Sequence, residues 1–287
     1  MAEIREKISA SGSRQEISTV MMYKIFSPLL FVVILQSSCQ RVPVTGRKQL
    51  NLVPNSLIQS MAFTEYDSII NVTHVLPASN AQTQMVRNVG IRIQHAVENY
   101  MNQNGLAKQI RDFKWEYNLI DENTINAWCM PGGKVVVYSG LLPITQDEPS
   151  LAIVMGHEIA HAVARHGNER MSQMMVAEGL GMGLDLALSN NSAQTRSIFM
   201  TAYGAGAGLG QLAYSRTHES EADKLGLVFA AMAGYDPNKA VAFWERMAAK
   251  SGGAKPPELL STHPSDARRI ADIKAYMPQA MKYYHPG

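Results

Sequence analysis

The chain has 287 residues, of which 46% are hydrophobic and 17% are charged, and its formal net charge is +2. This length and apolar content suffice for one sizeable core. A net charge this small, without clustered lysine and arginine, excludes a nucleic-acid-binding surface. Two cysteines cannot form the disulfide framework of a small secreted domain.

The N-terminal segment has the pattern of a secretory signal. A single lysine precedes an apolar run over residues 25–35, and two small residues follow shortly after it. The run is too short to span a bilayer, which takes about 20 apolar residues. We therefore predict a signal segment over residues 1–38. A translation start at Met21 or Met22, which excludes residues 1–20, would give this signal a normal length.

Cys39 directly follows the two small residues, in a pattern that resembles a bacterial lipobox. Gln36 stands where most lipoboxes carry leucine, so an ordinary signal with an incidental cysteine is the alternative. We predict cleavage before Cys39, lipidation of its thiol, and a lipidated N-terminus and tether over residues 39–52. The protein is then expected to be a membrane lipoprotein of the bacterial cell envelope that faces the periplasm.

The chain after the tether, residues 53–287, is predicted to be a single domain. Helices are expected over residues 56–70 and 81–101, and in the second of these the apolar residues recur at helical spacing. From Pro149 to about Ala275 nearly all of the chain has a helical pattern. The predicted fold class is therefore α+β and mostly helical.

A small sheet is expected between these helical regions. Alternating apolar residues predict one strand over residues 114–120. Two more strands, over residues 126–130 and 134–138, are expected to form a hairpin around a turn that contains Gly132 and Gly133. The sheet is predicted to pack on the helix that follows it.

His157 and His161 lie four residues apart in that helix, so their side chains share one face. Two neutral imidazoles at this spacing can bind one Zn²⁺. Glu158 follows the first histidine and can reach a water at the metal without binding the metal. The flanking residues are apolar, and a metal ion satisfies polar side chains on a buried helix. The alternative is a helix with incidental histidines.

A catalytic zinc site keeps three protein ligands and one open position. His166 is near in sequence, but Ala164 and Gly167 stand where the metzincin pattern has glycine and histidine. Glu219 and Asp223, also four residues apart, are better candidates. Glu219 is expected to bind Zn²⁺, and Asp223 to accept a hydrogen bond from a ligating imidazole and fix its tautomer. The alternative is a charged helix face.

Five stretches of the chain are together specific enough to indicate a family: 45–50, 126–133, 157–161, 215–226 and 262–264. They span essentially all of the mature chain. The chain resembles the HtpX and CAAX-prenyl-protease family of gluzincin metallopeptidases, and most of all its soluble periplasmic lipoprotein branch, which includes BepA and LoiP. The resemblance implies a zincin-like domain, one zinc ion per chain, Glu219 as the third ligand, and a role in membrane-associated protein quality control.

These residues suggest roles in peptide hydrolysis. Glu158 is predicted to take a proton from water and pass it to the leaving amine. The resemblance places His263 near the metal. There it either donates to the oxyanion, binds zinc and keeps the enzyme latent, or serves as a structural residue of its loop. Arg216 either contacts the oxyanion or the acidic cluster, or pairs with Glu221.

Unfolded or extended proteins are the expected substrates. In zincins an edge strand often pairs with the backbone of an extended substrate. The strand that contains Lys134, Val135 and Val136 is predicted to be that edge. Gly132 and Gly133 would let the substrate backbone approach closely. The alternative is an ordinary strand of the sheet.

The predicted function is a zinc-dependent metalloendopeptidase that acts in envelope protein quality control. The alternative is a non-catalytic zinc-binding chaperone or assembly lipoprotein on the same fold. Such a scaffold has no need of Glu158, and structural zinc sites usually close with four protein ligands, often cysteines. The sequence carries no signal of oligomeric state.

Overall fold

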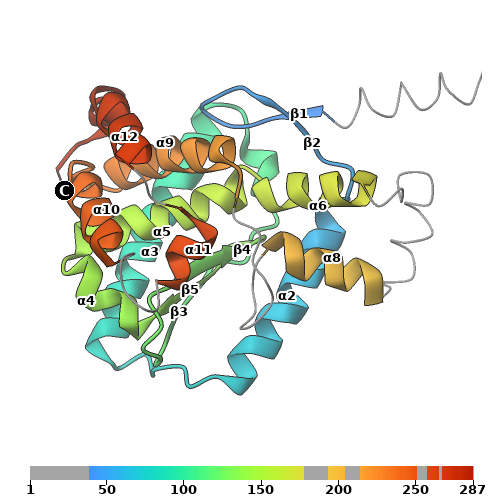
Figure 1. Ribbon diagram of the computed structural model, residues 1–287, viewed down its shortest axis with the longest axis horizontal. Helices are drawn as coiled ribbons and strands as arrows, with labels where there is room; N and C mark the ends of the chain where they lie inside the picture. Colours follow the sequence, from blue (N-terminus) through green and yellow to red (C-terminus); the bar gives the residue numbers. More distant parts are fainter. Residues whose placement is uncertain (1–38, 178–192, 204–213, 251–256, 265–266, 287) are drawn as a thin grey trace, which may run out of the picture.

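The computed structural model describes residues 39–177, 193–203, 214–250, 257–264 and 267–286. The predicted signal segment lies outside these residues. Helices dominate the described part of the chain, and a small sheet lies against them (Figure 1). None of the described helices combines the length and the apolar content that a membrane crossing requires.

The main sheet has three strands: β3 (Glu116–Ile120), β4 (Ala127–Met130) and β5 (Lys134–Tyr138). Their order is β3-β5-β4, with β5 parallel to β3 and antiparallel to β4. The predicted hairpin is confirmed, since Met130 pairs with Lys134 and Ala127 with Val137. The mostly helical α+β class is confirmed as well.

The prediction that β5 is an edge strand is wrong. Strand β5 lies between β3 and β4, so its backbone pairs on both sides and cannot also pair with a substrate. Val135 and Val136 are fully buried. The Lys134 ammonium bonds Glu116 at 2.8 Å within the sheet. The order of the strands in the sequence could not reveal this, because β3 pairs with β5 and not with β4, the strand that follows it in the chain.

Gly132 and Gly133 have a packing role in place of the predicted substrate contact. Both have positive φ angles, 88° and 86°, which the tight turn requires. A Cβ atom on Gly132 would lie 2.5 Å from the ring of Phe63, and one on Gly133 would lie 2.6 Å from the ring of Trp115. Aromatic side chains therefore cover the positions that we expected a substrate backbone to approach.

The two faces of the sheet pack against different helices, because side chains alternate along each strand. Leu119, Val135 and Val137 join the core that contains α3 and α5. Ile120 and Val136 join a second core with α2, α6 and α8. The bounds of these helices are α2 Asn55–Val72, α3 Ala81–Gln103, α5 Glu148–Val163, α6 His166–Ala177 and α8 Ala193–Tyr203.

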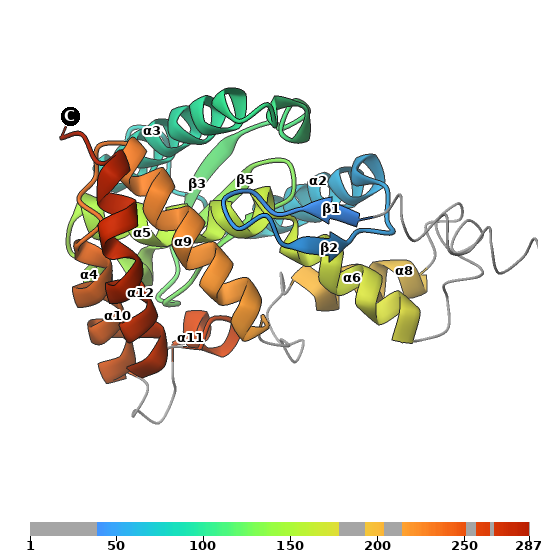
Figure 2. The same ribbon diagram turned by 90° about the horizontal axis from the view of Figure 1, so that it is seen from above.

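The C-terminal helices gather on one side of α5, and α6 and α8 lie toward its other end (Figure 2). The C-terminal group comprises α9 Arg216–Met232, α10 Lys239–Lys250, α11 Glu258–Thr262 and α12 Ala267–Ala280. The remaining described helical elements are short: η1 Ala107–Gln109, η2 Ser139–Leu141, α4 Leu142–Thr145 and η4 Met281–Tyr283, which follows α12.

Helix α5 is capped and then sharply broken. The Asp147 carboxylate accepts the backbone N–H of Ser150 at 2.8 Å, which satisfies one of the free donors of the first turn. The helix ends at Val163, and Arg165 then adopts a left-handed conformation with φ 58°. This break lets α6 start in a new direction, so that His166 returns toward His161.

The segment that we predicted to be a tether is folded against the domain. Strands β1 (Cys39–Arg41) and β2 (Lys48–Leu50) form an antiparallel hairpin that lies beside α6 in both views (Figures 1 and 2). The backbone N–H of Leu52 donates to the Ser172 hydroxyl at 2.9 Å, which ties the end of the hairpin to α6. This hairpin is therefore part of the folded structure.

Candidate metal centre

Helices α5 and α9 cross at two glycines, and this contact creates the site. A Cβ on Gly156 would lie 2.9 Å from the carbonyl oxygen of Gly226, and one on Gly226 would lie 2.8 Å from the backbone nitrogen of His157. Only glycine permits backbones to approach this closely. The crossing brings Glu219, on α9, next to the histidines of α5.

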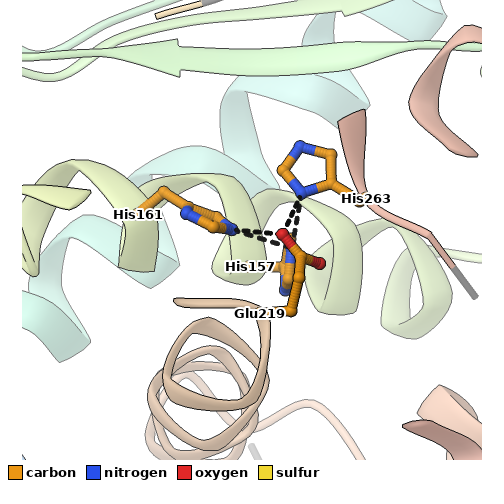
Figure 3. A group of neighbouring side chains, drawn as sticks. All are labelled: His157, His161, Glu219 and His263. Carbon is orange, nitrogen blue, oxygen red and sulfur yellow. Dashed lines mark hydrogen bonds and ion pairs between the residues drawn. The ribbon is translucent and has the colours of Figure 1, made fainter. Parts of the chain in front are cut away.

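Four side chains converge where the helices cross (Figure 3). His157 and His161 project from α5, Glu219 from α9, and His263 from the residue after α11. All four are buried, with 2–6% of each residue exposed. The ligand atoms of the four lie within 4.8 Å of one another.

The separations of these atoms fit a tetrahedral metal ion. Zinc-to-nitrogen bonds of about 2.0–2.1 Å in tetrahedral geometry put the ligand atoms about 3.3–3.4 Å apart. His157 Nε2 lies 3.1 Å from His161 Nε2 and 3.2 Å from His263 Nδ1. Glu219 Oε1 lies 3.4 Å from His161 Nε2 and 2.8 Å from His263 Nδ1. Lone pairs of neutral imidazoles at these distances repel one another unless a proton or a cation lies between them.

The electrostatics also suit a cation. Burial lowers the pKa of His161 well below 6.5, so its ring is neutral, as a metal ligand must be. Burial raises the pKa of Glu219, but the nearby His263 and Arg269 outweigh it and hold this pKa well below its usual range. Burial lowers the pKa of His157 as well, but hydrogen bonds to two carboxylates outweigh it and raise this pKa, so this ring must release any second proton when it binds a metal. Neutral imidazoles and an ionised carboxylate are the donors that Zn²⁺ prefers.

Asp223 and Arg269 lie directly behind the cluster. Asp223 Oδ1 is 3.0 Å from His157 Nδ1. Arg269, on α12, donates to both carboxylate oxygens of Asp223 at 2.9 and 2.7 Å and lies 2.9 Å from Glu219 Oε2. Its guanidinium also stacks over Trp244, 3.6 Å from the ring centroid. Arg269 could not be predicted from the sequence, because it lies 46 residues beyond Asp223 in no local motif.

Other arginines make the contacts with acidic residues that we considered for Arg216, and its contact with the oxyanion remains a prediction. It is exposed at the start of α9, and the arginine that contacts the acidic residues of the metal cluster is Arg269. The cation at Glu221 is likewise another residue, Arg47, at 2.9 Å. Both pairings join segments far apart in the sequence, which spacing along α9 could not indicate.

Two aromatic residues border the cluster. The ring of His166 is fully buried, and its Nδ1 lies 3.0 Å from His161 Nδ1. Tyr214, just before the Ser215 cap of α9, has its ring centroid 4.1 Å from that of His161 and 5.5 Å from that of His263. Tyr214 was not predicted, because no catalytic motif includes it. The one sequence signal is its position directly before the cap of α9, the helix that carries Glu219.

Glu158 lies beside the cluster, 3.5 Å from His263. Its Oε1 atom is buried, and no hydrogen-bond partner for it occurs among the described residues. The nearest base is His263, whose Nε2 lies 3.5 Å away. Burial raises the pKa of Glu158 to about 7, against the opposing charge of His263. A carboxyl group with this pKa can accept and release a proton near neutral pH.

Two histidines on one buried helix, an acidic residue on a second helix and a buried carboxylate beside them are the arrangement of a zincin-type metallopeptidase site. The comparison with family models agrees: the model for peptidase family M48 matches residues 88–277, well over half of the chain. The chain belongs to peptidase family M48. The resemblance predicted from the motifs is thereby confirmed.

Similar proteins come from mitochondria and from bacteria. The chain is 35% identical to the mitochondrial metalloendopeptidase OMA1 of Schizosaccharomyces pombe, over 83% of this chain and 66% of that protein. It is 30% identical to the human mitochondrial metalloendopeptidase OMA1, over 88% of this chain and 49% of that protein. It is 31% identical to the beta-barrel assembly-enhancing protease of Escherichia coli, over 56% of this chain and 34% of that protein. The chain thus spans less than two thirds of the length of each of these relatives.

Proposed function

We propose that this protein is a zinc-dependent metalloendopeptidase that cleaves extended or misfolded proteins. One observation carries the proposal: the ligand atoms of His157, His161 and Glu219 converge, and the buried carboxylate of Glu158 lies beside them, with no hydrogen bond to its Oε1 atom from the described residues. We assign the first three as ligands of one Zn²⁺ per chain. The peptidase family and the names of the relatives, a metalloendopeptidase and a protease, support the same class of reaction.

In the proposed mechanism, Glu158 moves the protons. A zinc ion held by these ligands supplies Lewis acidity: it lowers the pKa of water and polarises the scissile carbonyl. Glu158 accepts a proton from the attacking water and delivers it to the leaving amine nitrogen. Its burial and its pKa of about 7 suit both transfers.

Asp223 and Arg269 hold the first ligand in place. The carboxylate of Asp223 accepts the Nδ1–H of His157, which leaves the lone pair of Nε2 free to face the cluster. The bidentate contact of Arg269 keeps Asp223 ionised and fixes its position. This supports the assignment of Asp223 as a residue that orients a ligand.

We propose that His263 is a fourth ligand that keeps the resting enzyme latent. Its Nδ1 lies as close to the ligand atoms of His157 and Glu219 as they lie to each other. A bound His263 occupies the position that water needs. Movement of the His263 ring away from this position opens the site. The displaced ring is then available to donate a hydrogen bond to the oxyanion.

Strand β4 is the proposed substrate edge, in place of β5. It pairs with β5 on one side, and no described strand pairs with its other side. It packs against α5, which carries the metal ligands. An extended substrate segment that adds to β4 would therefore run past the cluster. Main-chain pairing of this kind selects unfolded segments more than particular sequences.

For the cellular role we propose envelope protein quality control by a lipoprotein attached to the membrane through Cys39. The signal and lipobox patterns of the sequence support the anchor, and the name of the Escherichia coli relative, a beta-barrel assembly-enhancing protease, supports a role in the bacterial envelope. Several other relatives carry names that place them in mitochondria. Unfolded protein substrates and the membrane are the proposed partners.

One observation favours a second candidate function. Four protein donors, with His263 as the fourth, are typical of a structural zinc site. The alternative is therefore a non-catalytic zinc-binding chaperone or assembly factor. Glu158 argues against it, because its buried Oε1 atom accepts no hydrogen bond from the described residues, and a scaffold has no use for such a group.

The peptidase and the non-catalytic scaffold predict different effects of His263→Ala on casein cleavage. We expect the variant to retain zinc and to cleave fluorescent casein roughly tenfold faster than the wild-type full chain, because the open form no longer competes with a closed one. The matched control is His285→Ala, which replaces an exposed histidine and leaves the rate unchanged.

A variant that holds zinc but cleaves more slowly than wild type contradicts latency and assigns His263 to the oxyanion. If neither protein cleaves casein while both hold zinc, the peptidase proposal fails and the scaffold remains.

A further inference from the structure

The turn between β1 and β2 reaches the back of the metal centre. Residues 42–47 form this turn, in which Val44 and Gly46 have positive φ angles and the backbone N–H of Gly46 donates to the carbonyl oxygen of Val42 at 2.9 Å. The tight turn directs Arg47 toward α6 and α9. The side chain of a residue only eight positions after Cys39 thus reaches two buried carboxylates of the domain while remaining 27% exposed itself.

Arg47 grips one carboxylate from each of these helices. Its Nη1 and Nη2 donate to the two oxygens of Glu169, on α6, at 2.7 and 2.6 Å. Its Nε and Nη2 donate to the two oxygens of Glu221, on α9, at 2.9 Å each. The hydroxyl of Thr45 adds a third donor to Glu221 at 2.8 Å. Only a planar guanidinium can make two such forked contacts.

The two carboxylates in turn hold two stacked histidines. His218 Nε2 lies 2.9 Å from Glu169, and His166 Nε2 lies 3.1 Å from Glu221. The rings of His166 and His218 stack with centroids 4.6 Å apart. Both carboxylates are only 4% exposed, and two buried negative charges on neighbouring helices need a cation between them.

The contact between Glu221 and His166 determines which ring nitrogen of the metal ligand His161 carries the proton. An ionised carboxylate only accepts, so His166 Nε2 carries the proton that it donates to Glu221. The neutral ring then has its lone pair on Nδ1, which accepts the Nδ1–H of His161 at 3.0 Å. His161 is left with an unprotonated Nε2, and this is the atom that faces His157.

We propose that Arg47 is a positioning residue for the metal ligand His161 and that the N-terminal hairpin is therefore an integral part of the metal centre. Arg47 acts through Glu221 and His166, which fix the ring and tautomer of His161. The inference rests on the proposed metal site and adds an element that the zincin motifs do not contain. It links the segment next to the proposed lipid anchor directly to zinc affinity.

The test measures the metal affinity of purified full-length variants by competition with a chromophoric chelator. We expect Arg47→Ala to weaken Zn²⁺ binding by about 10- to 100-fold, the usual effect of losing a residue that holds a metal ligand in position through hydrogen bonds. Arg47→Lys, which keeps the charge but loses the forks, is expected to weaken it less. Arg41→Ala is the matched control, because exposed Arg41 lies on the same hairpin and its side chain donates to the turn carbonyl of Gly46, away from Glu169 and Glu221.

Two further measurements separate positioning from general stability. The visible absorption bands of bound Co²⁺ report coordination geometry, and we expect them to change in both Arg47 variants but not in Arg41→Ala. We also expect the double variant Arg47→Ala/His166→Ala to bind Zn²⁺ no more weakly than His166→Ala alone, since both changes break one chain of contacts.

Unchanged Zn²⁺ affinity and Co²⁺ bands in folded Arg47→Lys and Arg47→Ala would overturn this inference and leave the metal site intact. Wild-type protein that binds neither metal would instead refute the proposed function, and the role of Arg47 with it.

Discussion

Replacing Glu158 with glutamine is expected to lower peptide hydrolysis roughly 100- to 10,000-fold, the usual contribution of a general base. The amide has nearly the same shape as the carboxylate, but it cannot accept the proton of the attacking water. Because Glu158 is not assigned as a ligand, zinc binding should persist. The measurement compares casein cleavage and zinc content in Glu158→Gln and wild type, both in the His263→Ala background if the wild type is latent.

The matched control is Glu245→Gln, which removes an exposed carboxylate paired only with exposed Lys274. We expect this control to retain full activity. Full activity in Glu158→Gln would show that another group transfers the proton, and loss of zinc from that variant would mean that Glu158 is itself a ligand.

The second large effect concerns the crossing of α5 and α9. In Gly226→Ala the new Cβ would lie 2.8 Å from the His157 nitrogen and 2.9 Å from the His157 Cα, and backbone atoms cannot rotate away. The helices must separate, so we expect the free energy of unfolding to fall by about 1–3 kcal/mol, the cost of overpacking a core. The separation also moves Glu219 away from the histidines, and zinc affinity should fall with stability.

Urea unfolding of the zinc-free protein and a chelator competition measure the two effects separately. Ser220→Ala is the control, because Ser220 lies on the same helix, is only partly buried and loses little volume. If Gly226→Ala matched this control in both measurements, the close crossing would not be what assembles the site.

The histidines, Glu158 and the acidic pair on α9 could be predicted because short helical spacing encodes them. His157 and His161 share a helix face, as do Glu219 and Asp223, so residue number alone indicates their neighbours. The elements themselves were predictable for the same reason: periodicity and turn residues are local signals. The predicted helix over residues 81–101 is confirmed as α3.

The parts that could not be predicted depend on contacts between distant segments. Arg269 reaches Asp223 across α12 and α9, and Arg47 reaches Glu169 from a hairpin that we predicted to be a tether. Arg269 lies in no motif, and Arg47 lies in a stretch that indicates the family but not the contacts that this side chain makes. The place of β5 in the middle of the sheet depends on its pairing with β3, which alternation within either strand cannot show.

The division of the chain into a signal segment, a lipidated N-terminus and a peptidase domain remains a prediction. The hairpin at 39–50 bears on it, because a lipid on Cys39 would lie at the first residue of β1. The folded domain would then sit close to the membrane, with little free chain between the anchor and the metal centre.

X-ray absorption at the zinc edge of the full chain tests the central claim most directly. The account predicts one zinc per chain, surrounded by nitrogen and oxygen atoms at about 2.0–2.1 Å with histidine scattering and no sulfur. Glu219→Ala should lose most of this metal, whereas Glu245→Ala should keep it. A sulfur shell at about 2.3 Å, or full zinc occupancy in Glu219→Ala, would contradict the assignment of His157, His161 and Glu219 as the metal centre.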